Sequence, residues 1–235
     1  MGKIEKKGKG LPLFYLTHMQ FPTQNRQNVI VFLLIFLDFM GVIPLLSDPF
    51  SKGYFLAGVI PVVALHIWGL LYIVAPFKFE KSYYLYMGLL GIITAYVYFI
   101  VAQKLLYIHV GVEGRLYELI SFVFLVVVLV FFQIFNYKML YSGQYDKLDK
   151  NPSGLNLSPI VTASSIGYIV AQFLLSLAVT DSFMMIVMVA AYSILTLIMA
   201  YIATYLHRYI YFLKNSDQLE SMRSGFGRPK KERKY

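Results

Sequence analysis

The chain has 235 residues, of which 58% are hydrophobic and 14% are charged, and its net charge is +9. Soluble domains carry roughly 45–50% apolar and about 25% charged residues, so this composition excludes an ordinary soluble globule. The absence of cysteine excludes disulfides, thiol catalysis, iron–sulfur clusters and thiolate zinc sites.

The first predicted element is a membrane-spanning helix at residues 29–46, which follows a basic segment at residues 1–27. We expect that segment to lie in the cytosol or on the membrane surface. It lacks the short apolar core and small-residue cleavage site of a secretory signal. The first span is therefore expected to stay in the protein as an anchor.

Five further apolar runs are each long enough to cross a hydrocarbon core of about 30 Å. They predict helices at residues 54–75, 83–102, 116–136, 159–179 and 183–213. Pro61 lies inside the second span and is expected to kink it, because proline lacks an N–H and clashes with the preceding turn. The sequence thus predicts an all-α, polytopic six-helix bundle over residues 28–213 and a polybasic tail at residues 214–235.

The positively charged residues predict the orientation of the bundle. Eighteen of the 21 Lys and Arg residues lie in the N-terminal segment, the second and fourth connections and the tail, and three lie in the alternate connections. Because cytoplasmic connections carry the excess of Lys and Arg, both termini are expected in the cytosol. We therefore predict a multi-pass protein of the cell membrane.

Aromatic and polar residues near the predicted span ends are expected at the level of the lipid headgroups. Tyr83, Tyr84 and Tyr86 open the third span, and amphipathic rings are favoured at the membrane interface. Gln103 and Gln133 lie near opposite ends of their spans and are interpreted in the same way.

Asp38 is the most informative residue, because it lies well inside the first apolar span. At roughly 15 Å of depth, a charge there costs several kcal/mol and needs a partner, a proton or water. Counting along antiparallel helices puts His66 of the second span within about one turn of the same depth. One interpretation is a proton-responsive or cation-contacting pair, and the other is a hydrogen-bonded Asp that only fixes helix packing.

Two stripes of small residues predict close helix contacts, because small side chains let neighbouring backbones approach. They consist of Ala163, Gly167 and Ala171 in the fifth span and Gly88, Gly91 and Ala95 in the third. The alternative for the fifth span is a polar substrate path, lined by Thr162, Ser165 and Gln172.

The tail carries five cations within seven residues: Arg228, Lys230, Lys231, Arg233 and Lys234. Beside an anionic leaflet each cation contributes on the order of 1 kcal/mol, so contact with anionic lipid headgroups is expected. The alternative is a docking segment for an acidic partner.

No catalytic constellation is evident from the sequence. The four histidines are too scattered for a His-box or HExxH metal site, and neither a GxSxG nor a Walker sequence occurs. We expect no cofactor, no metal and no nucleic-acid partner. The favoured function is a non-enzymatic accessory, assembly or immunity-type subunit for another membrane or secreted protein, with a homo-oligomer also open. The rival is a small transporter or channel with Asp38, His66 and Gln172 as its polar centre, and an intramembrane enzyme comes third.

Overall fold

The computed structural model describes residues 19–145, 181–216 and 226, and within them every regular element is helical. The elements in chain order are α2 (Pro22–Val31), η1 (Phe32–Val42), α3 (Ile43–Leu46), α4 (Lys52–Val74), α5 (Tyr83–Lys104), η2 (Leu105–Val110), α6 (Leu116–Tyr141), α9 (Asp181–Ile202) and α10 (Tyr205–Lys214). Here η1 and η2 are π-helical. The expected all-helical class is confirmed for this part of the chain.

Five helical segments of the described chain are long and apolar enough to span a membrane. They are Pro22–Leu46, Lys52–Val74, Tyr83–Val110, Leu116–Tyr141 and Phe183–Lys214. They correspond to five of the six predicted spans, and the predicted span at residues 159–179 lies outside the described residues. Most run beyond their predicted ends, because hydropathy marks the apolar centre of a helix and not its polar first and last turns.

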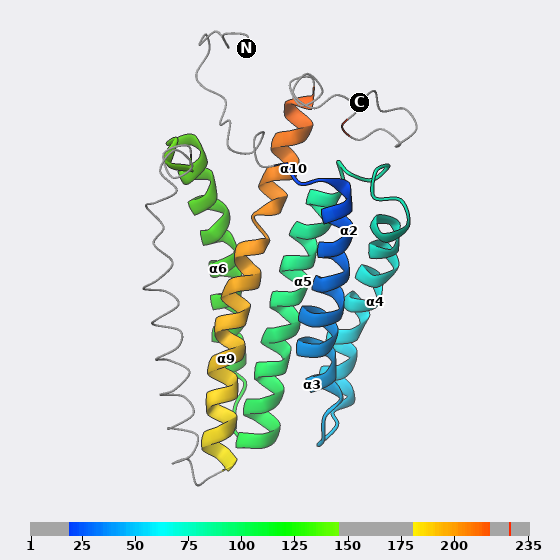
Figure 1. Cartoon of the computed structure of the whole chain (residues 1–235). Coiled ribbons are helices and arrows are strands. Elements are labelled where there is room, and N and C mark those ends of the chain that lie inside the picture. Colours follow the sequence, from blue (N-terminus) through cyan, green and yellow to red (C-terminus); the bar gives the residue numbers. More distant parts are fainter. Residues whose placement is uncertain (1–18, 146–180, 217–225, 227–235) are drawn as a thin grey trace, which may run out of the picture.

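The helices stand side by side as a bundle, in which the first four spans alternate in direction and α9 runs parallel to α6 (Figure 1). The start of α2 and the end of α10 lie at one end of the bundle, and α3 and the start of α9 lie at the other. Helix α5 is central. In the apolar 18-residue stretch of the Tyr83–Val110 span, 72% of the residues are buried inside the protein, whereas at most 28% are buried in the corresponding stretch of each of the other four described spans. The other described spans therefore turn most of their surface outward.

Helices α5 and α9–α10 approach closely at the small residues of α5. A Cβ atom at Gly91 would lie 2.6 Å from the backbone nitrogen of Ala203 and 2.9 Å from the carbonyl oxygen of Met199. Gly88 faces Leu206 in the same way, and Ala95 is fully buried. The small-residue stripe of the third span thus lies at a backbone-to-backbone contact.

The first span is irregular in its C-terminal half. An 11-residue π-helix, η1, leads into α3, where Pro44 removes one backbone donor. Two tyrosine hydroxyls serve the carbonyls of this stretch: Tyr98 donates to Phe36 at 2.6 Å and Tyr192 donates to Met40 at 3.0 Å. Side chains of α5 and α9 therefore donate hydrogen bonds to backbone carbonyls of the first span.

Lys104 completes this arrangement at the end of α3. Its side chain is fully buried, and its ammonium donates to the carbonyls of Pro44, Leu45 and Ser47 at 3.0, 3.1 and 2.6 Å. These carbonyls form the C-terminal end of a helix, which carries partial negative charge and has no intrahelical donors. Lys104 is thus a cap for the first span.

Two sequence-based expectations are corrected here. The third span was expected at residues 83–102, yet its helix continues to Val110 and buries Gln103 and Lys104, because the end of the first span supplies hydrogen-bond acceptors for the Lys104 ammonium. Gln133 donates to the Ala203 carbonyl at 2.7 Å, and its interfacial position stays a prediction. The last span is not one helix: it breaks at Ala203 and Thr204, where Thr204 N–H bonds back three residues instead of four.

The tyrosines at the start of α5 do not face the headgroups as expected. Tyr83, Tyr84 and Tyr86 are fully enclosed by protein. They belong to an aromatic cluster in which Tyr86 packs on Tyr72 and Tyr84 packs edge-on against Phe212. The interfacial interpretation was wrong because burial depends on neighbouring helices, which a residue's position along its own span does not show.

The guanidinium of Arg208 is the cation of this aromatic cluster. Its Cζ atom lies 4.9 Å from the centre of the Tyr84 ring, 5.4 Å from that of Phe212 and 5.9 Å from that of Tyr205. Aromatic faces attract cations through their quadrupole, most strongly where water is excluded. The cluster therefore ties α10 to the start of α5.

The Gly91 contact can be tested by adding one methyl group. Gly91→Ala would press a Cβ against the backbone of α9–α10, which cannot rotate away, so we expect a loss of about 1–3 kcal/mol in stability. Thermal unfolding in detergent measures it. Gly53→Ala is the control, since Gly53 lies in α4 with nothing within 4 Å of its Cβ position. Equal melting temperatures for the two variants would disprove the close contact.

The Lys104 cap makes a second prediction. Lys104→Met keeps the length of the side chain but leaves carbonyls at the end of α3 without a donor, so stability should fall by about 1–3 kcal/mol. Lys52→Met, at an exposed position, should change it by less than about 0.5 kcal/mol. A Lys104→Met protein as stable as the Lys52→Met protein would show that the ammonium does not hold the first span.

Candidate polar site on the first two membrane helices

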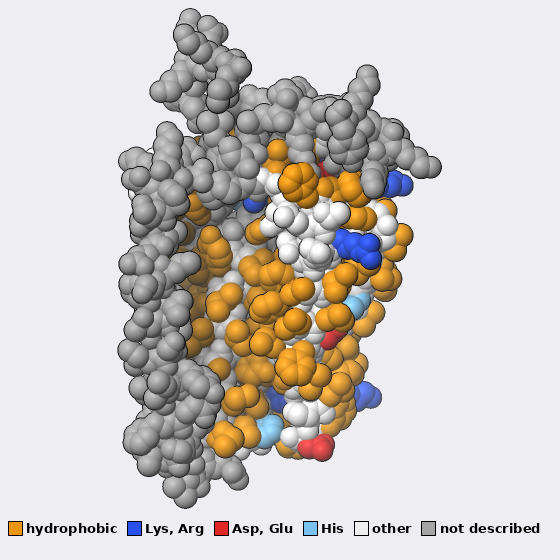
Figure 2. Space-filling view, viewed as in Figure 1, with side chains coloured by type: hydrophobic (Ala, Val, Ile, Leu, Met, Phe, Trp, Pro, Cys, Tyr) orange, Lys and Arg blue, Asp and Glu red, His pale blue; other side chains and the backbone are white. Residues whose placement is uncertain are grey.

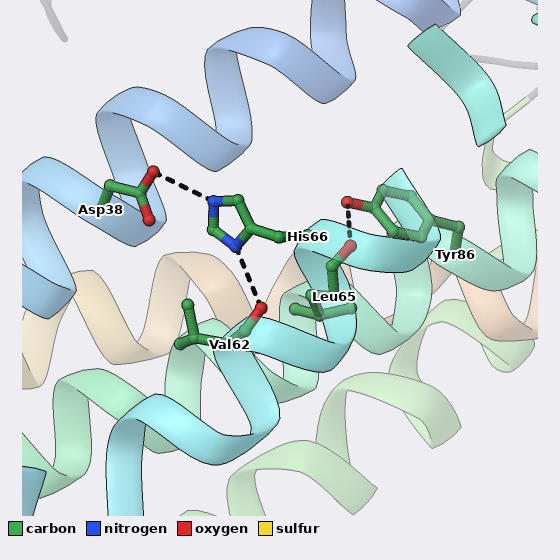
Figure 3. A network of polar contacts seen from close by, with 5 residues as sticks. All are labelled: Asp38, Val62, Leu65, His66 and Tyr86. Atoms are coloured by element: carbon green, nitrogen blue, oxygen red, sulfur yellow. Dashed lines mark hydrogen bonds and ion pairs between the residues drawn. The ribbon is translucent and has the colours of Figure 1, made fainter. Parts of the chain in front are cut away.

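The structure brings Asp38 of η1 and His66 of α4 into direct contact. His66 Nε2 lies 3.0 Å from Asp38 Oδ2, and His66 Nδ1 lies 3.0 Å from the carbonyl oxygen of Val62, one turn earlier in α4 (Figure 3). The ring is therefore held at both nitrogens. The depth match expected from the sequence corresponds to a contact, and its role stays a prediction.

If both contacts are hydrogen bonds, they set the proton content of the pair. A carbonyl oxygen only accepts, so the hydrogen bond to Val62 requires a hydrogen on His66 Nδ1. The contact between Nε2 and Oδ2 then needs one more hydrogen, carried either by a carboxylic acid or by an imidazolium. In both cases Asp38 and His66 share one proton and have no net charge together. Such a pair is far less costly in a bilayer than the lone carboxylate that the sequence suggested.

The pair lies on the outside of the bundle. The side chains of His66 and Asp38 are 35% and 33% exposed. Flanking residues such as Phe39, Val63 and Ile67 are exposed and apolar, and hydrophobic side chains dominate the face shown in Figure 2. The site is therefore a polar spot on a lipid-facing surface and not the lining of a central path.

Helix α5 supports the turn of α4 that carries His66. The Tyr86 hydroxyl donates to the carbonyl of Leu65 at 3.4 Å (Figure 3), and a Cβ atom at Gly69 would lie 2.7 Å from that hydroxyl oxygen. Trp68 packs edge-on against the same tyrosine ring. The inner side of α4 is thus fixed to α5, while His66 points toward η1.

Asp38 retains capacity for one further interaction. Its Oδ2 atom contacts His66, whereas its Oδ1 atom makes no hydrogen bond within the described part of the chain. A carboxyl oxygen at this depth gains from any donor that reaches it, since lipid tails offer none. The site can therefore accept a hydrogen bond from a group outside the protein.

The remaining predicted site residues fall into two groups. Gly88, Gly91 and Ala95 lie at the contact of α5 with α9 and α10, away from the polar pair. The others lie outside the described residues: Thr162, Ala163, Ser165, Gly167, Ala171 and Gln172 of the fifth span, and Arg228, Lys230, Lys231, Arg233 and Lys234 of the tail. No group of three or more potential metal ligands occurs among the residues that the structure describes.

Sequence reasoning missed Lys104 as a structural cation. The available signal was that Leu105 and Leu106 continue the apolar run directly after it. A cation with apolar neighbours on both sides inside one helix needs a buried set of acceptors, and the end of a neighbouring helix is such a set.

Comparison with known proteins identifies no relative. No family model, no curated protein and no solved structure matches the chain. What the polar pair does is therefore inferred from its own geometry and chemistry.

A double-mutant cycle tests whether Asp38 and His66 stabilise each other. Asp38→Ala and His66→Ala each leave one polar group facing lipid without its partner, so each should lower stability in detergent or nanodiscs. The double variant should lose less than the sum of the two, with a coupling of about 0.5–3 kcal/mol. Strictly additive losses would show that the contact contributes nothing.

Proposed function

We propose that the chain is a non-enzymatic membrane protein, an accessory, assembly or immunity-type subunit that binds another membrane protein through its η1–α4 face. The observation that carries this proposal is the contact between Asp38 and His66, whose side chains are each about one third exposed in an apolar surface. A polar group that faces lipid is costly, whereas one that meets a polar group on a neighbouring helix is favourable.

The chemistry of the pair specifies the partner surface. Asp38 Oδ1 accepts, so the partner helix would present a donor such as a serine or threonine hydroxyl, an amide or an imidazole. Around that donor, small apolar residues would let the helix approach Val63, Ile67 and Leu70, which are exposed on α4. Hydrogen bonds between membrane helices contribute about 0.6–2 kcal/mol, so one such bond adds specificity while packing adds most of the affinity.

We further propose six spans, with both termini in the cytosol of a cell-membrane protein. Helix α6 ends at the end of the bundle where α10 also ends, whereas α9 begins at the opposite end (Figure 1). The chain between them has to pass from one end to the other, which supports a sixth crossing. Lys104 lies inside a helix, so the predicted outer connections hold even fewer cations than the sequence count assumed.

The second candidate function is a small transporter or channel that uses the proton shared by Asp38 and His66. The observation in its favour is the pair itself, since ionisable residues within membranes often mark proton or ion pathways. Two observations favour the accessory function instead: the pair faces outward, and neither of the two cavities beside α5 and α6 is lined by Asp38 or His66.

Two substitutions of Asp38 separate the candidates. In Asp38→Asn the amide N–H can still donate to His66 Nε2 and its oxygen can still accept from a partner, but no proton can move. Asp38→Leu removes both contacts. A binding function should survive the first variant and be lost in the second, whereas proton-coupled flux should be lost in both.

The measurement is photo-crosslinking in native membranes with the full chain. A photoreactive residue replaces Leu70, which lies one turn after His66 on the same face, and in a control it replaces Phe131 of α6; these positions are 56% and 58% exposed. We expect a discrete protein adduct at position 70 only, retained with Asp38→Asn and lost with Asp38→Leu. An adduct of two copies of this chain would identify the partner as itself. Two outcomes would contradict the proposal. One is the detection of lipid adducts, without any protein adduct, at both positions. The other is proton flux in proteoliposomes that Asp38→Asn abolishes.

A further inference from the structure

A second site lies on the other side of α5, in a cavity enclosed by α5, α6 and α9. Its volume is about 330 Å³. That value falls within the roughly 300–1,000 Å³ of small-molecule pockets. Helix α6 packs loosely beside the cavity, since only 6% of the residues in its apolar 18-residue stretch are buried. Its walls are mostly hydrophobic, with Phe99 of α5 and Phe124 of α6 among them.

One buried amide in the cavity has no partner. Gln103 lines the cavity, is 2% exposed, and its Oε1 atom makes no hydrogen bond among the described residues. An unpaired polar atom inside a protein costs about 1–3 kcal/mol, and in a membrane no water is at hand to compensate. A ligand that supplies the missing hydrogen bond would remove that cost.

Besides Gln103 and the partly exposed Tyr117, three hydroxyl side chains line the cavity and narrow the ligand class. The hydroxyls of Ser121, Ser193 and Thr196 donate to carbonyls of their own helices at 2.6, 2.8 and 2.8 Å. Their hydrogens are therefore used, and only their lone pairs remain for a ligand. No Asp, Glu, Lys, Arg or His lines the cavity, so its walls offer no counter-charge for an ion. A neutral ligand with a hydrogen-bond donor fits this set.

The position of the cavity indicates how such a ligand arrives. Ile120 and Phe124 of its α6 wall are more than half exposed, so the cavity borders the lipid-facing surface. Gln103 lies about 10 Å from the end of the Tyr83–Val110 helix, near one membrane surface, whereas Val128 and Leu197 lie farther in. The polar group thus sits near the surface and the apolar walls extend toward the bilayer centre, as in a lipid molecule.

We propose that this cavity binds a neutral membrane lipid that carries a free hydroxyl group, such as a diacylglycerol. The lipid hydroxyl hydrogen-bonds to the side-chain amide of Gln103, and its hydrocarbon chain contacts Phe99 and Phe124. The site is separate from the η1–α4 face and does not depend on what that face binds.

The experiment measures lipid binding to the full-length protein in nanodiscs. The probe is dioctanoylglycerol, and the comparison lipid is trioctanoylglycerol, which has the same apolar chains but no hydroxyl. We expect saturable binding of the first lipid and at least tenfold weaker binding of the second. Gln103→Met keeps the size of the side chain and removes the amide, so it should weaken binding of dioctanoylglycerol at least tenfold.

Two further variants keep the result interpretable. Thr94→Val removes another buried hydroxyl of α5 that has no hydrogen-bond partner and does not line the cavity, so binding should stay unchanged. Ser193→Leu fills the cavity and should abolish binding. Equal binding of the two lipids, equal loss in the Thr94→Val and Gln103→Met proteins, or unchanged binding in Ser193→Leu would each overturn the proposal.

Discussion

The hydrogen bonding of the first span is the constraint on which the rest of the bundle depends. A bilayer offers no water to backbone groups, so an irregular helix inside it must find partners within the protein. The span Pro22–Leu46 is irregular because η1 is π-helical and Pro44 removes a donor. Tyr98 and Lys104 of α5 and Tyr192 of α9 donate hydrogen bonds to carbonyls of this span. Helices that are distant in sequence thus support the first span, in keeping with the central and most buried position of α5.

The same constraint positions the candidate site. With its carbonyls held on the side of α5 and α9, η1 turns Asp38 outward, toward α4. His66 is oriented independently by its bond to the Val62 carbonyl, and Tyr86 fixes the neighbouring carbonyl of Leu65. The imidazole therefore meets Asp38 with its second nitrogen. The second carboxyl oxygen of Asp38 makes no hydrogen bond within the described part of the chain and can accept one from a partner helix.

The sequence was sufficient for the features that depend on composition along one helix. Apolar runs predicted the five described spans, and depth counting brought Asp38 and His66 together. It was insufficient where a neighbouring helix decides the outcome. Lys104 looked like the end of a span because hydropathy cannot include the three carbonyls that accept hydrogen bonds from its ammonium. Tyr83, Tyr84 and Tyr86 looked like interfacial anchors because their position along the span resembles that of exposed rings. The outward direction of the Asp38–His66 pair could not be predicted either, since the π-helical register of η1 sets it.

Polar groups in this bundle divide according to how completely they are paired. Lys104, Tyr98 and Tyr192 donate to carbonyls of the first span, and such fully paired groups hold helices together without leaving capacity for a ligand. Asp38 and Gln103 differ, because each keeps one oxygen without a hydrogen bond among the described residues. In lipid such an oxygen carries a free-energy cost that folding alone does not offset. Asp38 and Gln103 lie on opposite sides of α5, one on an exposed face suited to a helix and one in a cavity suited to a lipid chain. Incomplete pairing is not sufficient by itself, since the Thr94 hydroxyl is also unpaired among the described residues but does not line this cavity. The candidate binding sites combine an incompletely paired group with room for a ligand beside it.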